Sequence, residues 1–89
     1  MNSQNKIKIG ILGGSGYAGE ELVRLISLHP NANLVAVSSR DLNGKSLQSV
    51  YGQIHDLPKI NFVNPDDSVF LECEVVFLAT PHGLSLIHI

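Results

Sequence analysis

The sequence has one cysteine, no tryptophan and no apolar run close to the roughly 20 residues that cross a bilayer. The single cysteine, Cys73, excludes an internal disulfide framework and is typical of a reducing compartment. The amino-terminal residues also lack the apolar segment of a secretory signal peptide. We therefore expect a cytoplasmic location.

Charge is scarce as well, since charged residues make up 16% of the chain and the net charge is −2. This balance offers no general electrostatic attraction to nucleic acid or to an anionic membrane, so we expect neither as a partner. Histidine and cysteine do not occur at the spacing of metal ligands, and no metal site is expected. A hydrophobic content of 44% is typical of a globular domain.

The most informative segment is the glycine-rich run at residues 13–19, which follows an apolar stretch at 7–12. The apolar stretch predicts a buried strand, and apolar residues at helical spacing predict a helix from 17 to about 28. Pro30 is expected to end that helix, and residues 34–38 predict a second strand. Strand, helix and strand then form one parallel βαβ unit.

Further along the chain we expect a short helix near 46–51, a strand at 60–63, a helix from 65 to about 71 and a strand at 74–79. The fold class predicted is α/β, with the parallel sheet and helices of a Rossmann-type domain. A complete domain of that type takes about 150 residues. We therefore expect residues 1–89 to be one incomplete doubly wound domain with about four strands, whose last strand leaves an unpaired edge.

The glycine run predicts a phosphate-binding turn, because its spacing satisfies G-x-G-x-x-G between a strand and a helix. Gly13 permits a tight turn with positive φ, and Gly16 lets a pyrophosphate approach the backbone. Gly19 allows the helix to pack closely on the first strand. The helix end supplies N–H donors and a partial positive charge, and Ser15 adds a hydroxyl donor. The alternative is a purely structural turn.

The end of the second strand bears on cofactor choice. Proteins that prefer NAD usually have a carboxylate there, about 20 residues past the glycine turn, whereas this strand ends in Ser38, Ser39 and Arg40. A serine hydroxyl and the Arg40 guanidinium suit a 2′-phosphate, which favours NADP over NAD. Two alternatives stay open: Asp41 holds a ribose instead, or the segment is only a solvated polar loop.

The predicted strand at 74–79 ends at a second loop, Thr80-Pro81-His82-Gly83, on the edge where open parallel sheets bind ligands. His82 is a candidate proton donor or substrate-orienting group, although a structural role is the more common one for a loop histidine. Cys73 precedes this strand at the opposite end and has no basic neighbour in sequence. We therefore interpret Cys73 as an inert thiol rather than a nucleophile.

Two stretches of the sequence resemble N-acetyl-gamma-glutamyl-phosphate reductases. They are residues 8–25, KIGILGGSGYAGEELVRL, and residues 77–83, FLATPHG, which is similar to the family's Phe-Leu-Ala-Leu-Pro-His-Gly with Thr80 in place of leucine. Ser38-Ser39-Arg40 also matches the family, and the resemblance covers residues 6–84. It implies an NADP-dependent oxidoreductase that reduces N-acetyl-glutamyl 5-phosphate to the semialdehyde in arginine biosynthesis, as a homo-oligomer acting on a small-molecule substrate.

The resemblance transfers only cofactor-binding residues to this chain. They are Gly13, Ser15, Gly16, Tyr17, Ala18, Gly19, Ser38 and Arg40, together with Pro81, His82 and Gly83 near the nicotinamide. The family's catalytic cysteine stands in an Asn-Pro-Gly-Cys motif that these 89 residues do not contain, so no catalytic residue is assigned and no reductase activity is expected of the 89 residues alone.

Residues 84–89 depart from the family pattern, in which this segment continues into a helix. We interpret them as a foreign or misread end of a truncated gene. Two other functions remain open: another semialdehyde dehydrogenase, such as the aspartate type, and a nucleotide-binding module without catalysis.

Overall fold

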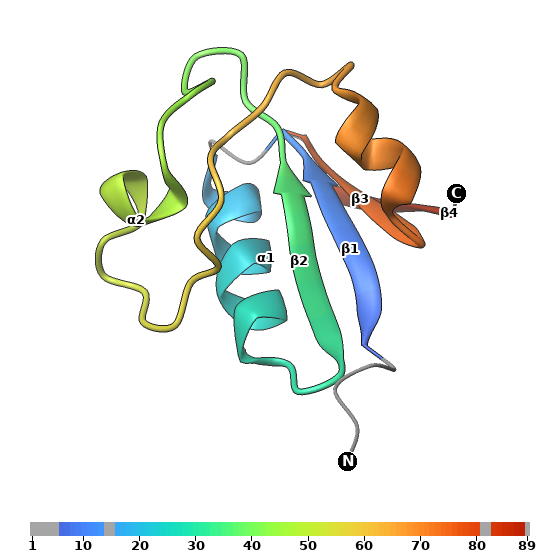
Figure 1. Cartoon of the computed structure of the whole chain (residues 1–89), viewed down its shortest axis with the longest axis horizontal. Helices are drawn as coiled ribbons and strands as arrows, with labels where there is room; N and C mark the ends of the chain where they lie inside the picture. Colours follow the sequence, from blue (N-terminus) through green and yellow to red (C-terminus); the bar gives the residue numbers. More distant parts are fainter. Residues whose placement is uncertain (1–5, 14–15, 81–82, 89) are drawn as a thin grey trace.

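The computed structural model describes residues 6–13, 16–80 and 83–88. Four strands form one sheet in the order β2-β1-β3-β4 (Figure 1). They are β1 (Ile7–Leu12), β2 (Ala32–Val37), β3 (Val75–Thr80) and β4 (Gly83–His88). The first three run parallel, and β4 pairs antiparallel with β3. The predicted α/β class with a parallel sheet and helices is thereby confirmed.

The βαβ unit at the amino terminus has the predicted form. Helix α1 (Tyr17–Leu28) connects β1 to β2 and buries Gly19, Leu22, Val23 and Ile26 against the sheet. It ends at Leu28, two residues before Pro30, because His29 already has an extended backbone. The His29 N–H still donates to the Ile26 carbonyl, and its Nδ1 accepts from the Asn31 N–H at 3.1 Å.

Both faces of the sheet are covered. On one face α1 and the short helix α2 (Leu47–Val50) enclose a core around Ile11, Val37 and Phe62. On the other face the 3₁₀ helix η2 (Ser68–Glu72) contributes Phe70 to a smaller core with Cys73 and Val76. Gly10 of β1 is needed there, since a Cβ would lie 2.8 Å from Cys73 Sγ and 3.0 Å from the Phe70 ring.

The two predicted short helices are present, and each is capped by the side chain of its N-cap residue. Ser46 Oγ accepts from the Ser49 N–H at the start of α2. Asp67 Oδ1 accepts from the Val69 N–H at the start of η2. Both helices are shorter than predicted, because each is a single turn held by its cap and by one buried side chain, Leu47 or Phe70.

The prediction of a strand at 60–63 is wrong in form, because this segment makes only two isolated bridges. Val63 bridges Ser38 in parallel, and Asn61 bridges Ser46 in antiparallel fashion. The physical reason is that the segment divides its hydrogen bonds between two partners: the Val63 N–H donates to Val37, and the Phe62 N–H donates to Lys45. Neither partner runs beside it long enough to form a ladder.

The expectation that the strand at 74–79 leaves an unpaired edge is also wrong, because among the described residues β4 and not β3 is the edge strand. Residues 83–88 form β4, which pairs with β3 from Thr80↔Gly83 to Val75↔His88. The connection between the paired residues is two residues long, as in a tight hairpin, and the backbone groups on that side of β3 are satisfied by β4. The segment that departs from the family pattern thus extends the sheet with an antiparallel strand.

Among the described residues, α1 is the longest helix at 12 residues, and none has the length and apolar character needed to cross a membrane.

Candidate functional site

The carboxyl ends of β1, β2 and β3 meet at one edge of the sheet, where the arrowheads of β1 and β2 point together in Figure 1. The chain leaves β1 for β2 on one side, and β3 pairs on the other side of β1. This reversal of strand order is the place where open parallel sheets bind nucleotides. The glycine turn and the loop after β2 both emerge at this edge.

Gly13 is held between the ends of two strands. Its backbone has φ +85°, in the left-handed region that favours glycine, as the sequence predicts. Its N–H donates to Ser38 Oγ at 2.9 Å, and a Cβ on Gly13 would lie 2.5 Å from the Ala79 carbonyl oxygen. Gly13 therefore turns the chain where no side chain fits, and its N–H is already engaged within the chain.

Gly16 has a different reason to be glycine. It is the N-cap of α1 with an ordinary extended backbone, φ −100° and ψ −175°. A Cβ there would meet none of the described atoms within 4 Å. The fold itself does not require glycine at this position, so the open space at the amino end of α1 fits a bound group.

The first turn of α1 offers donors to such a group. Gly16 has no side chain with which to cap the helix, and among the described residues no side-chain hydrogen bond caps the first N–H groups of α1. An uncapped helix start with its partial positive charge favours an anion such as a pyrophosphate. Tyr17 is 94% exposed beside it, Ala18 is half-buried, and Gly19 lies on the buried face of the helix.

Two buried serines and an exposed arginine follow directly after β2. Ser38 is 1% exposed, and its oxygen accepts from Gly13. Ser39 is 4% exposed, and its Oγ accepts from the Leu42 N–H at 3.1 Å. Arg40 and Asp41 follow with exposed side chains. The predicted 2′-phosphate ligands therefore differ in access: Arg40 faces solvent, whereas Ser38 is buried, and its bond from Gly13 uses an acceptor site of the hydroxyl and not its O–H proton.

Several predicted site residues lie outside the described part of the chain. They are Ser15, Pro81 and His82, and their predicted contacts with a cofactor stay predictions. Gly83 is described only through its backbone, which begins β4 opposite Thr80.

Cys73 lies away from this edge. It is buried, its Sγ approaches the Val69 carbonyl at 3.9 Å, and burial raises the pKa of the thiol. A buried thiol with a raised pKa is a poor nucleophile, which agrees with the inert role predicted from the sequence. Among the residues that the structure describes, no group of three or more His, Cys, Asp or Glu side chains could hold a metal ion.

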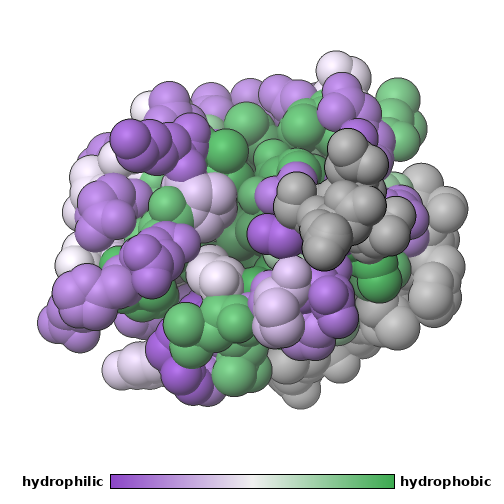
Figure 2. Space-filling model, turned by 60° about the horizontal axis from the view of Figure 1, so that its bottom comes forward, coloured by the Kyte–Doolittle hydropathy of each residue, from purple (hydrophilic) through white to green (hydrophobic). Residues whose placement is uncertain are grey.

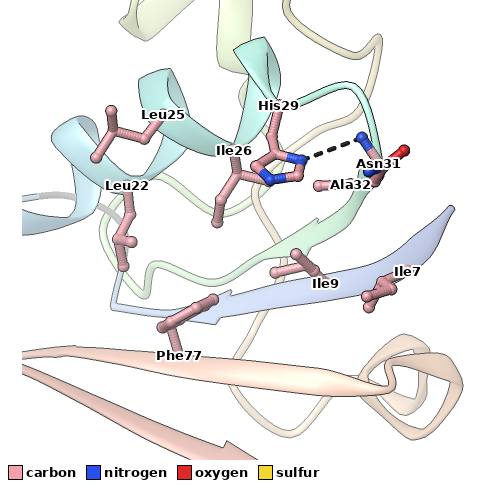
Figure 3. Close-up of a pocket in the computed structure, with 9 residues that line it drawn as sticks. All are labelled: Ile7, Ile9, Leu22, Leu25, Ile26, His29, Asn31, Ala32 and Phe77. Carbon is pink, nitrogen blue, oxygen red and sulfur yellow. Dashed lines mark hydrogen bonds between the residues drawn. The ribbon is translucent and has the colours of Figure 1, made fainter.

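An apolar groove of about 340 Å³ lies at the other end of the sheet (Figure 3). Its walls come from β1, α1, β3 and the turn before β2, with Ile9, Ile26 and Phe77 among them. The two polar side chains lining it belong to His29 and Asn31, and the His29 ring accepts from the Asn31 backbone. Figure 2, turned so that this end comes forward, shows apolar residues on the surface beside hydrophilic ones. The lining offers no cation for a phosphate, so this groove is not the candidate cofactor site.

Sequence reasoning missed one residue of the site. Ser39 was predicted only as part of the strand end, although it is buried and holds the loop that carries Arg40. Its partner, Leu42, has no distinguishing sequence pattern. A repeated serine directly after a buried strand is the one available clue.

A glycine turn that opens an uncapped helix at the carboxyl edge of a parallel sheet defines a dinucleotide-binding α/β domain. The sequence comparison is more specific. Residues 8–88 match the family described as semialdehyde dehydrogenase, NAD binding domain, and the chain belongs to this family.

The relatives found are consistent with this family. The chain is 42% identical to N-acetyl-gamma-glutamyl-phosphate reductase from Ruthia magnifica subsp. Calyptogena magnifica, over 90% of this chain and 24% of that protein. It is 48% identical to the protein of the same name from Methanothrix thermoacetophila, again over 90% and 24%. The chain thus spans about a quarter of the length of these curated relatives. The resemblance noted in the sequence is confirmed.

A solved structure is also similar. It is the crystal structure of aspartate semialdehyde dehydrogenase with NADP from Candida albicans, with a TM-score of 0.70 and 30% sequence identity. The match covers 84% of this chain and 23% of that one.

Proposed function

We propose that this chain is the NADP-binding, amino-terminal part of an N-acetyl-gamma-glutamyl-phosphate reductase. The whole enzyme would reduce N-acetyl-glutamyl 5-phosphate to N-acetyl-glutamate 5-semialdehyde in arginine biosynthesis. The observation that carries the proposal is an identity of 42–48% with reductases of that name over 90% of the chain. The uncapped start of α1 gives these residues a physical task that fits a dinucleotide.

The backbone at the start of α1 would hold the pyrophosphate. The N–H groups of Tyr17, Ala18 and Gly19 belong to the uncapped first turn, and Gly16 leaves the approach open. Ser15 would add a hydroxyl donor, and Gly13 shapes the turn without lending its own N–H. When bound, the cofactor would supply the hydride of the reduction.

Arg40 would distinguish NADP from NAD. Its side chain is exposed at the end of β2, and a guanidinium matches the geometry of a 2′-phosphate. Ser38 belongs to the same proposed site, as do Pro81, His82 and Gly83 beside the nicotinamide. Asp41 is the competing residue, because its carboxylate would bind a ribose and repel the extra phosphate of NADP.

The experiment is a titration with NADPH and NADH, together with an Arg40→Ala variant. NADPH is expected to bind more tightly than NADH, and the variant should lose that preference. Equal affinities in the unsubstituted chain would contradict the choice of NADP. Retention of the preference by the variant would remove Arg40 from its proposed role.

The chemistry of the proposed reaction lies outside these residues. Cys73 is buried on the η2 face, and no nucleophile is assigned within 1–89. We therefore expect that the 89-residue chain, as one incomplete domain, binds cofactor without reductase turnover. A homo-oligomeric, cytoplasmic enzyme acting on a small molecule remains the prediction for the whole protein.

Aspartate semialdehyde dehydrogenase is the second candidate, because the solved structure found to be similar has that name. The natural protein carrying this chain would be assayed with N-acetyl-glutamate semialdehyde, phosphate and NADP. Turnover supports the reductase. Turnover of aspartate semialdehyde alone would reverse the assignment.

A further inference from the structure

Strand β2 is followed by two consecutive serines, Ser38 and Ser39, that are both buried and both accept a backbone N–H. Successive side chains of an extended segment point to opposite sides, so the two hydroxyls reach different loops. Ser38 Oγ accepts from Gly13 at 2.9 Å, and Ser39 Oγ accepts from Leu42 at 3.1 Å. Each bond fixes the start or the end of a loop at the carboxyl edge of the sheet.

Ser38 fixes the glycine turn. Its backbone N–H donates to the carbonyl of Ile11 in β1 at 2.8 Å, and its hydroxyl accepts from Gly13, two residues further along. A Cβ on Gly13 would meet the Ala79 carbonyl, so Gly13 is confined between the ends of β2 and β3. Loss of the hydroxyl would leave the partly buried Gly13 N–H without its acceptor. The turn that leads to Gly16 and α1 would then lose its fixed starting point.

Ser39 fixes the loop that carries Arg40. Its backbone N–H donates to the Val63 carbonyl at 3.0 Å, and its hydroxyl holds the Leu42 N–H. The Leu42 carbonyl in turn accepts from Lys45 at 2.9 Å. Arg40 therefore has an exposed side chain on a backbone that is tied at both ends, which limits where its guanidinium can lie.

We propose that Ser38 and Ser39 are two positioning residues with separate tasks in cofactor binding. Ser38 acts through Gly13 on the turn that meets the pyrophosphate, which NADPH and NADH share. Ser39 acts through Leu42 on the Arg40 loop, which meets the 2′-phosphate that only NADPH has. Ser38 serves the site by holding the turn rather than as a direct ligand of the 2′-phosphate. This inference rests on the proposed binding of NADP.

The test uses three probes on the natural protein that carries this chain: NADPH, NADH and adenosine 2′-monophosphate, the last measured by competition against NADPH. Adenosine 2′-monophosphate has the 2′-phosphate but no pyrophosphate. The variants are Ser38→Ala and Ser39→Ala. Ser46→Ala is the matched control, because it removes a serine hydroxyl that also accepts a backbone N–H, but at the start of α2.

We expect Ser38→Ala to lower the affinities for NADPH and NADH alike, about 5- to 10-fold. The affinity for adenosine 2′-monophosphate should not change. We expect Ser39→Ala to lower the affinities for NADPH and adenosine 2′-monophosphate by a similar factor, and to leave the affinity for NADH unchanged. Ser46→Ala should change none of the three. If the substitutions only loosen the fold in general, every variant should bind all three probes more weakly. That result would overturn the proposal.

Direct binding of the 2′-phosphate by Ser38 gives a different pattern. In that case Ser38→Ala would lower the affinities for adenosine 2′-monophosphate and NADPH but not the affinity for NADH. The positioning role of Ser38 would then be wrong, whereas the proposed binding of NADP would stand. If the unsubstituted protein binds neither dinucleotide, the proposed function itself fails. Should Ser38→Ala not fold, Ser38→Cys keeps the side-chain volume with a weak acceptor, and the same pattern is expected.

Discussion

The Gly13 N–H donates to the Ser38 hydroxyl at 2.9 Å, and this bond joins the end of β1 to the end of β2. The two residues are 25 positions apart in sequence. Gly13 also faces the Ala79 carbonyl, so this residue is held by both neighbours of β1. A residue fixed in this way before any cofactor arrives lowers the entropic cost of binding.

Gly13→Ala should destabilise the fold far more than Gly44→Ala. Both glycines have a positive φ, +85° and +89°, but only at Gly13 would a Cβ meet an atom, at 2.5 Å from Ala79 O. We expect a loss of about 1 kcal/mol for Gly44→Ala from backbone strain, and about 3 kcal/mol or more for Gly13→Ala. Urea unfolding measures both. Equal losses would show that the Ala79 contact has no energetic weight.

Gly16→Ala should separate binding from stability. The position has an ordinary backbone and open space around it, so the free energy of unfolding should fall only by about 1 kcal/mol, the cost of alanine in place of glycine at a helix N-cap. The new methyl group would occupy the approach to the α1 N–H groups, and NADPH affinity should fall at least about tenfold. Calorimetric titration beside urea unfolding checks both. Unchanged affinity would mean that the pyrophosphate does not pass Gly16.

Gly10→Ala should destabilise the η2 face by about 1–3 kcal/mol, because the added Cβ would crowd Cys73 Sγ at 2.8 Å and the Phe70 ring at 3.0 Å. The double variant Gly10→Ala with Cys73→Ala removes the closer of these contacts. Its loss should therefore be smaller than the sum of the two single losses, by about 0.5 kcal/mol or more. Strict additivity in urea unfolding would contradict the contact.

Tyr51→Phe should change the response of the fold to alkaline pH. Burial, with a smaller effect of Glu20, raises the pKa of Tyr51 to about 12 from an ordinary value of 10.0. The pKa of Tyr51 is higher in the folded state than in the unfolded chain. Its protonated form therefore makes its full contribution to the free energy of unfolding below about pH 10, and this contribution is lost as the pH rises toward 12. The phenylalanine variant should lose stability less steeply across that range.

At neutral pH the same variant should be as stable as the parent, or more stable by up to about 1 kcal/mol. The Tyr51 hydroxyl is buried and has no hydrogen-bond partner among the described residues, so its removal leaves no acceptor or donor stranded. A clear destabilisation at pH 7 would show that the hydroxyl makes a bond in solution.

Local pattern was sufficient for the elements that lie close together in sequence. The βαβ unit could be predicted because apolar spacing, the glycine run and Pro30 each act within a few residues of the element they define. The positions of Gly13 after β1 and of Gly16 at the start of α1 could be predicted for the same reason. The short helices at Ser46 and Asp67 were also predictable, since the cap and the capped N–H are neighbours.

Contacts between distant segments could not be predicted in this way. Residues 60–63 have the composition of a strand, yet their hydrogen bonds go to both Val37 and Lys45. The tail at 83–88 carries no local indication that it would pair with β3. Strand pairing depends on which edges are available in the folded chain, and this is not encoded within either segment alone.

The sequence by itself determined the class of the domain, its glycine turn and its family, because each depends on residue types at short, fixed spacings. The tertiary structure decided which groups of that site are free to bind. It engaged the Gly13 N–H and the Ser38 oxygen with each other and buried Ser39 beneath the Arg40 loop. The physical reason is that a hydrogen-bonding group can satisfy a partner within the chain or a ligand outside it, and only the packed strands bring those partners within reach.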